Sequence, residues 1–97
     1  MTLEEIIQDL HALEARIRAY ERKYGVTSKD FYELYRQGLL DDDGFAQTTE
    51  FTRWASSYEM KLEREADFER MSSAFLQSLR QEAADRPLRL TPNPQLA

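Results

Sequence analysis

Cysteine is absent from this sequence of 97 residues, and glycine and proline occur only three times each. Without cysteine the chain has no disulfide, no thiolate metal site and no thiol nucleophile. So few glycines and prolines exclude a fold with many tight turns, and they favour long, uninterrupted helices. The glycines are isolated from one another, so the sequence has no glycine-rich phosphate or dinucleotide loop.

Histidine occurs once, as His11. A zinc site of the usual kind needs several His or Cys ligands, and di-metal carboxylate bundles need Glu-x-x-His motifs that are missing here. The acidic run Asp41–Asp43 lacks the alternating ligands of an EF-hand loop. We therefore expect no metal, no cofactor and no enzymatic activity.

Long apolar runs are also absent, since none approaches the roughly 20 residues that cross a bilayer. The N-terminal stretch Met1–Glu5 is acidic and has neither the basic nor the apolar region of a signal peptide. We expect a cytoplasmic protein without membrane contact. Its net charge of −5 disfavours nucleic acid as a ligand and suits a basic protein partner.

Aromatic residues are abundant and are concentrated in the middle of the chain. Phe51, Trp54, Ala55 and Tyr58 recur at spacings of three and four residues, which places them on one face of a helix. We predict an aromatic corner that consists of Tyr24, Phe31, Tyr35, Phe51, Trp54 and Tyr58. This corner is either the core between helices or an exposed patch that grips a partner.

Start and stop signals divide the chain into three helices. Thr2 and Glu5 have the spacing of a capping box, and Gly25 is suited to the position just after a helix. Thr27 opens a second helix, and Pro87 prevents the third from continuing. We predict helices at about 2–24, 28–37 and 45–84, a single domain at 1–85 and an extended, proline-containing tail at 86–97.

The first helix carries three heptads of apolar residues, which predict packing along its whole length. These residues are Leu3, Ile6, Leu10, Leu13, Ile17, Tyr20 and Tyr24. The apolar stripe of the last helix thins at Lys61–Asp67, so we allow for a break near Ala66. The predicted fold class is all-α: a hairpin of the first and last helices with a short connecting helix. We expect it to form a homodimer, as a four-helix-type bundle.

The two long helices differ in length. At about 1.5 Å per residue, the first spans roughly 33 Å and the last roughly 60 Å. A hairpin that brings Tyr24 to Phe51 therefore leaves the end of the last helix uncovered. A second copy, another protein or the tail must cover it. We predict that the partner-binding residues are Phe75, Leu76, Leu79, Leu88 and Leu90.

The middle of the chain also carries a set of spaced residues with a familiar pattern. These are Phe31-Tyr32, Tyr35, Gly38, Leu40, Asp42, Glu50-Phe51, Trp54-Ala55 and Tyr58-Glu59-Met60. The set resembles short all-helical bacterial proteins that are encoded beside a small toxin and regarded as its antitoxin-like partner. The chain differs from that pattern in the insertion Ala46–Thr49 and in a longer C-terminal helix and tail. The resemblance implies a non-enzymatic protein-binding module that neutralises a basic, nuclease-like toxin.

Two other functions are compatible with the sequence. One is a homodimeric helical adaptor or assembly protein that has no toxin partner. The other is an accessory nucleic-acid-binding protein that uses Arg16, Arg18, Arg22 and Lys23, although basic residues also suit the C-terminal end of a helix. The stretch Arg86–Pro92 alternates apolar and polar residues, so it is either disordered or able to add an extended segment to a partner.

Overall fold

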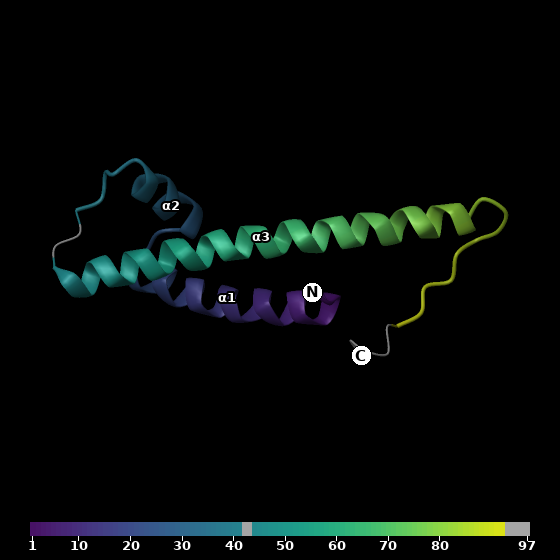
Figure 1. Cartoon of the computed structure of the whole chain (residues 1–97), viewed down its shortest axis with the longest axis horizontal. Helices are drawn as coiled ribbons and strands as arrows, with labels where there is room; N and C mark the ends of the chain where they lie inside the picture. Colours follow the sequence, from purple (N-terminus) through teal and green to yellow (C-terminus); the bar gives the residue numbers. More distant parts are fainter. Residues whose placement is uncertain (42–43, 93–97) are drawn as a thin grey trace.

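The structure, a computed structural model of the chain, describes residues 1–41 and 44–92. These residues form three helices and no strand: α1 spans Leu3–Tyr24, α2 spans Ser28–Arg36 and α3 spans Phe45–Glu82. The long helix α3 packs along α1, and α2 covers the first part of α3 (Figure 1). The predicted all-α fold, in which a long last helix packs on the first, is confirmed.

Local capping fixes the ends of α1 and the start of α2. The Thr2 hydroxyl accepts a hydrogen bond from the Glu5 backbone N–H at 3.2 Å, and the Glu5 carboxylate accepts one from the Thr2 backbone N–H. Gly25 ends α1 at a φ of 69°, a left-handed conformation that glycine adopts without steric cost. Thr27 caps α2 by accepting from the backbone N–H of Asp30. These caps are the ones that the sequence predicted.

The helix α3 is continuous through Lys61–Asp67, where the sequence left room for a break. This segment consists mainly of strong helix formers, and its charged side chains pair with neighbours. Arg64 donates to Asp9 of α1 at 3.1 Å. The helix ends at Glu82, two residues earlier than expected. Asp42 and Asp43 of the acidic run lie outside the described residues.

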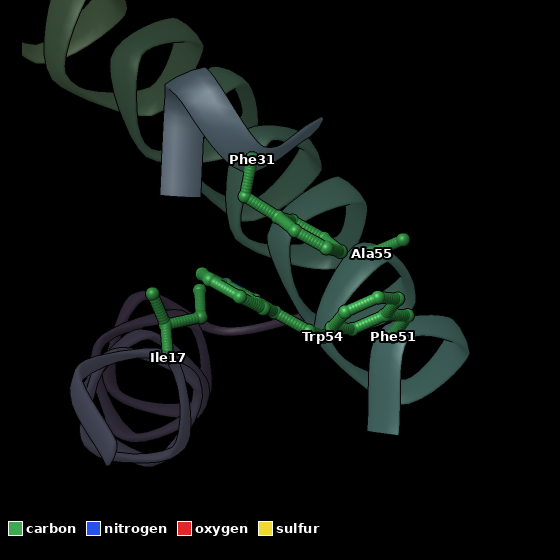
Figure 2. Packing of buried hydrophobic residues seen from close by; sticks show 5 residues of the cluster. All are labelled: Ile17, Phe31, Phe51, Trp54 and Ala55. Atoms are coloured by element: carbon green, nitrogen blue, oxygen red, sulfur yellow. The ribbon is translucent and has the colours of Figure 1, made fainter. Parts of the chain in front are cut away.

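The core lies at the corner where the three helices meet, and Trp54 of α3 is at its centre with 0% of its surface exposed. The Phe31 ring of α2 stacks on the indole, with 3.7 Å between ring centroids. Figure 2 shows the indole between Phe31 and Ile17, which come from different helices. Tyr20 of α1 also stacks on Trp54 at 5.6 Å. Aromatic burial at this corner therefore joins all three helices.

A buried serine hydroxyl accepts a hydrogen bond from the N–H of this indole. The Trp54 Nε1–H donates to the Ser28 hydroxyl at 2.8 Å, and Ser28 is itself buried. Ser28 is the first residue of α2, where a backbone N–H has no partner within its own helix. That N–H donates to the Glu21 carboxylate of α1 at 2.7 Å. One residue thus links α2 to both long helices.

Beyond the corner, α1 runs antiparallel to α3, and its inward face is buried at Ile6, Leu13 and Ile17. Several contacts that α3 makes with this face are polar. Arg16 donates to the Ser57 hydroxyl at 3.4 Å, in addition to the pair that Arg64 forms with Asp9. The middle of the hairpin is therefore held in register by polar contacts as well as by apolar packing.

Replacing Ser28 with alanine should destabilise the protein, because the buried indole N–H of Trp54 would lose its acceptor. The expected loss in the free energy of unfolding is about 1–3 kcal/mol. Chemical denaturation followed by the fluorescence of the single tryptophan measures it. Ser56→Ala, at an exposed position of α3, is the control and should change stability by less than about 0.5 kcal/mol. Equal midpoints for the two variants would contradict the role of this hydrogen bond.

Candidate binding surface

The helix α3 extends well past the end of α1. Met1 and Ile6 line one shallow hollow together with Asp67, Arg70 and Met71, so α1 begins opposite that part of α3. From there α3 continues to Glu82 (Figure 1). Residues 72–82, called the overhang below, add roughly 16 Å of helix that α1 does not cover.

The overhang carries large apolar side chains that are exposed to solvent. Phe75 is 61% exposed and Leu76 is 49% exposed, while Leu79 is half-buried. No charged residue occurs from Met71 to Leu79. Contiguous exposed apolar surface of this kind marks sites of protein–protein interaction.

The side of α3 that faces α1 has an unusual distribution of polarity. Spacings of three and four residues define one stripe along it, which consists of Ser57, Lys61, Arg64, Phe68, Ser72, Phe75 and Leu79. The first four residues lie where α1 packs: Ser57 and Arg64 hydrogen-bond to it, and Phe68 lines a hollow with Ile7 and Leu10. The apolar residues Phe75 and Leu79 follow where α1 has ended. A hairpin that acts alone would gain most from the opposite order, because apolar burial stabilises and polar burial does not.

The described part of the tail does not close this surface. After α3 the chain turns back in the direction of α1 (Figure 1). Leu88 is 40% exposed and Leu90 is 75% exposed, and Phe75 remains 61% exposed. The structure thus places the five predicted partner-binding residues in the half of the molecule away from α2, three on the overhang and two on the tail.

The predicted aromatic corner is largely core. Phe31, Phe51 and Trp54 are buried, and Tyr24 packs edge-on against Phe51 at 5.5 Å. Tyr24 and Tyr58 are half-buried, and Tyr35 is 36% exposed and stacks on Phe31 at 5.6 Å. These residues hold the three helices together, and Tyr35 is the most exposed of them.

Two glutamates of α3 form a polar rim around the corner. Glu50 accepts hydrogen bonds from the Tyr24 hydroxyl and from the Lys23 ammonium group. The Tyr32 hydroxyl donates to Glu59 at 2.6 Å. Neither glutamate was predicted as a site residue. For Glu50 a signal exists, because it lies four residues before Trp54 and so shares its side of the helix.

These hydrogen bonds shift the ionisation of the groups that make them. The hydrogen bond from Lys23, with that from Tyr24, lowers the pKa of Glu50. The same carboxylate raises the pKa of Lys23 and the pKa of Tyr24, mainly through the hydrogen bonds. The three groups therefore favour the ionic state in which the carboxylate is charged, the ammonium group is charged and the phenol is neutral.

The basic cluster at the end of α1 is mostly engaged with the protein itself. Arg16 is bound to Ser57 and Lys23 to Glu50, as described above. Arg18 lies 4.0 Å from Glu14, and the Arg22 side chain donates to the Arg18 backbone carbonyl. The Arg18 and Lys23 side chains nevertheless stay 69% and 57% exposed.

Residues 1–41 and 44–92 also bear on metal binding and on membrane insertion. In these ranges no group of His, Asp and Glu side chains is arranged to hold a metal ion. Within the same ranges, no helix is both long and apolar enough to cross a bilayer. Comparison of the chain with protein-family models, curated proteins and solved structures gives no match.

Glu50→Gln should flatten the dependence of stability on pH at both extremes. Because the pKa of Glu50 is lowered on folding, its contribution is present above its ordinary pKa of 4.5 and is lost as the pH falls through the folded-state pKa. Because the pKa values of Tyr24 and Lys23 are raised, their contribution is present below their ordinary values of 10.0 and 10.5 and is lost at higher pH.

Urea denaturation of the wild type and Glu50→Gln over a pH series measures this difference. The gap in the free energy of unfolding should be largest between these limits and should shrink outside them. Glu63→Gln, at an exposed position of α3, is the matched control and should follow the wild type. Parallel curves for the wild type and Glu50→Gln would show that the three groups are not coupled.

Proposed function

We propose that this protein is a non-enzymatic helical binding module that neutralises a small basic protein in the manner of an antitoxin. The observation that carries the proposal is the distribution of polarity along α3. Where α1 covers α3, the stripe includes the polar residues Ser57, Lys61 and Arg64, whereas beyond the end of α1 it carries Leu79 and the 61% exposed Phe75. A surface of this kind is stabilised when another polypeptide covers it.

The charge next to the overhang supports a basic partner. Between Glu59 and Glu69 the chain has five acidic and two basic residues. Both basic residues are paired within the chain: Lys61 with Glu65 at 3.4 Å, and Arg64 with Asp9 at 3.1 Å. The excess acidic groups attract a basic protein and accelerate its association, while apolar contact at the overhang provides affinity.

The tail adds a second apolar element. Leu88 and Leu90 are exposed and alternate with the polar residues Arg89 and Thr91 in an extended segment. Such a segment can lie along a partner with its apolar side chains inward. The partner-binding surface then consists of Leu76, Leu79 and Phe75 on the helix and of Leu88 and Leu90 on the tail.

A homodimeric adaptor is the second candidate, and one observation favours it. The stretch from Met71 to Leu79 carries no charge, so this part of the surface does not by itself select a basic partner. The two functions differ in whether a foreign basic protein binds. Nucleic-acid binding is less favoured, because contacts within the chain already engage the basic cluster of α1.

Co-expression with any short basic protein encoded in an adjacent reading frame tests the neutraliser. The two proteins should co-purify, and the growth arrest that the basic protein causes should be relieved. Leu76→Asp combined with Leu79→Asp should weaken the complex by more than about 100-fold, because an apolar contact would then contain unpaired carboxylates.

The matched control is Gln77→Asp combined with Gln81→Asp. It adds the same charge to the same turns of α3, but helical spacing places both residues on the opposite side. This variant should bind like the wild type. Full binding by the Leu76 and Leu79 double variant would remove the overhang as the contact surface. A basic neighbour that does not bind the wild type would argue against neutralisation.

A further inference from the structure

We infer that two copies of the chain pair through their overhangs. The two overhangs run antiparallel, and Phe75 of each copy packs against Leu79 of the other. This inference assigns Phe75 and Leu79 to a second copy instead of the basic protein, and it leaves Leu76 and Leu88 to that protein. It uses from the proposed function only the premise that the apolar stripe of the overhang is covered.

The chemistry of the overhang favours a copy of itself. From Met71 to Leu79 the helix has no charged residue, and the small residues Ser72 and Ser78 lie beside the large apolar side chains. Small residues let two helices approach closely, and large residues fill the space between them. An uncharged stripe gains no electrostatic attraction from a charged partner surface. It can form apolar contacts with an identical stripe. A two-fold axis makes one such patch complementary to itself.

α1 leaves the overhang uncovered, whereas the described tail turns back toward α1 (Figure 1) and would have to move aside for a second helix. A second α3 that runs antiparallel to the first enters from the free end and meets the stripe where α1 ends. With Phe75 opposite Leu79, Glu82 of one copy comes opposite Ser72 of the other, just beyond the first residues of α1. The second helix then prolongs the line of α1, so the contact continues the α1–α3 interface without displacing any part of it.

Helix polarity supports the same orientation. In this arrangement the C-terminal end of one α3 approaches the N-terminal end of the other copy's α1. The first end carries partial negative charge and the second carries partial positive charge, so the two helix dipoles attract. The described tail is a poorer occupant, since it leaves Phe75 61% exposed and Leu90 75% exposed.

The contact is small, so we expect a weak dimer. About three helical turns per copy bury less than the roughly 1,200 Å² that stable, specific complexes reach, so the dimer should dissociate in the micromolar range. Leu76 lies about a quarter turn from the centre of the stripe. It borders the paired helices and, together with Leu88, stays available to a basic partner.

The test is the mass of the purified chain by light scattering over a range of concentrations. The wild type and Gln77→Asp should shift from monomer to dimer in the micromolar range. Phe75→Asp and Leu79→Asp should stay monomeric at concentrations at least 100-fold higher. Helical content and the denaturation midpoint should stay near those of the wild type, because neither side chain belongs to the core at Trp54. A wild type that is monomeric throughout, or a Leu79→Asp variant that still dimerises, would overturn the inference.

A disulfide tests the register, because the chain has no cysteine of its own. Ser72→Cys and Glu82→Cys in one chain are roughly 15 Å apart along α3, too far for a bond within the chain. Mild oxidation should therefore link two copies. Gln77→Cys, on the opposite side of the helix, should stay unlinked. The antiparallel register would be refuted if Gln77→Cys formed as much disulfide-linked dimer as the double variant, or if the double variant formed no linked dimer.

The outcomes separate this inference from the proposed function. A chain that is monomeric but binds the basic neighbour refutes self-pairing and leaves the neutraliser in place. A chain that dimerises through Phe75 and Leu79 but binds no basic protein supports self-pairing and favours the adaptor.

Discussion

The indole of Trp54 is the point on which the architecture depends. Phe31 of α2 and Tyr20 of α1 stack on it, and Ser28 accepts its N–H. Because these contacts fix one end of the hairpin, α1 and α3 must lie side by side from that point onward. Their unequal lengths then decide where the cover over α3 ends. The exposed overhang is therefore a direct consequence of a corner that is anchored at the opposite end of the molecule.

Much of this fold can be predicted from the sequence, because its signals are local. Thr2 and Gly25 mark the ends of α1 through capping rules that involve a few neighbouring residues. The role of Ser28 was not predictable in this way. Its acceptor and donor contacts reach Trp54 and Glu21 on other helices, and no spacing along the chain encodes such a meeting. The predicted continuity of the last helix is correct despite the thinning of the apolar stripe near Ala66, because helix propensity and ion pairs keep α3 continuous there.

The candidate surface was predictable in position but not in detail. Helix lengths alone show that Phe75 lies beyond the reach of α1, since rise per residue is a fixed quantity. Spacing does not reveal which aromatic rings are buried. Phe51 and Phe75 both recur at helical spacing, yet Phe51 is core because α2 folds over it, whereas Phe75 is exposed. That difference depends on where the connecting helix lies, which only the assembled structure provides.

The polar pairs in the middle of the hairpin explain why the overhang stays open. If α1 slid two turns toward the end of α3, it would cover Phe75 and gain apolar burial. The slide would separate Arg16 from Ser57 and Asp9 from Arg64, and it would pull Tyr20 away from the indole. Exposed pairs of this kind contribute little stability, but a wrong register leaves their partly buried groups without partners, which costs more. The polar contacts therefore fix the register, and the register keeps the apolar end of α3 available to another polypeptide.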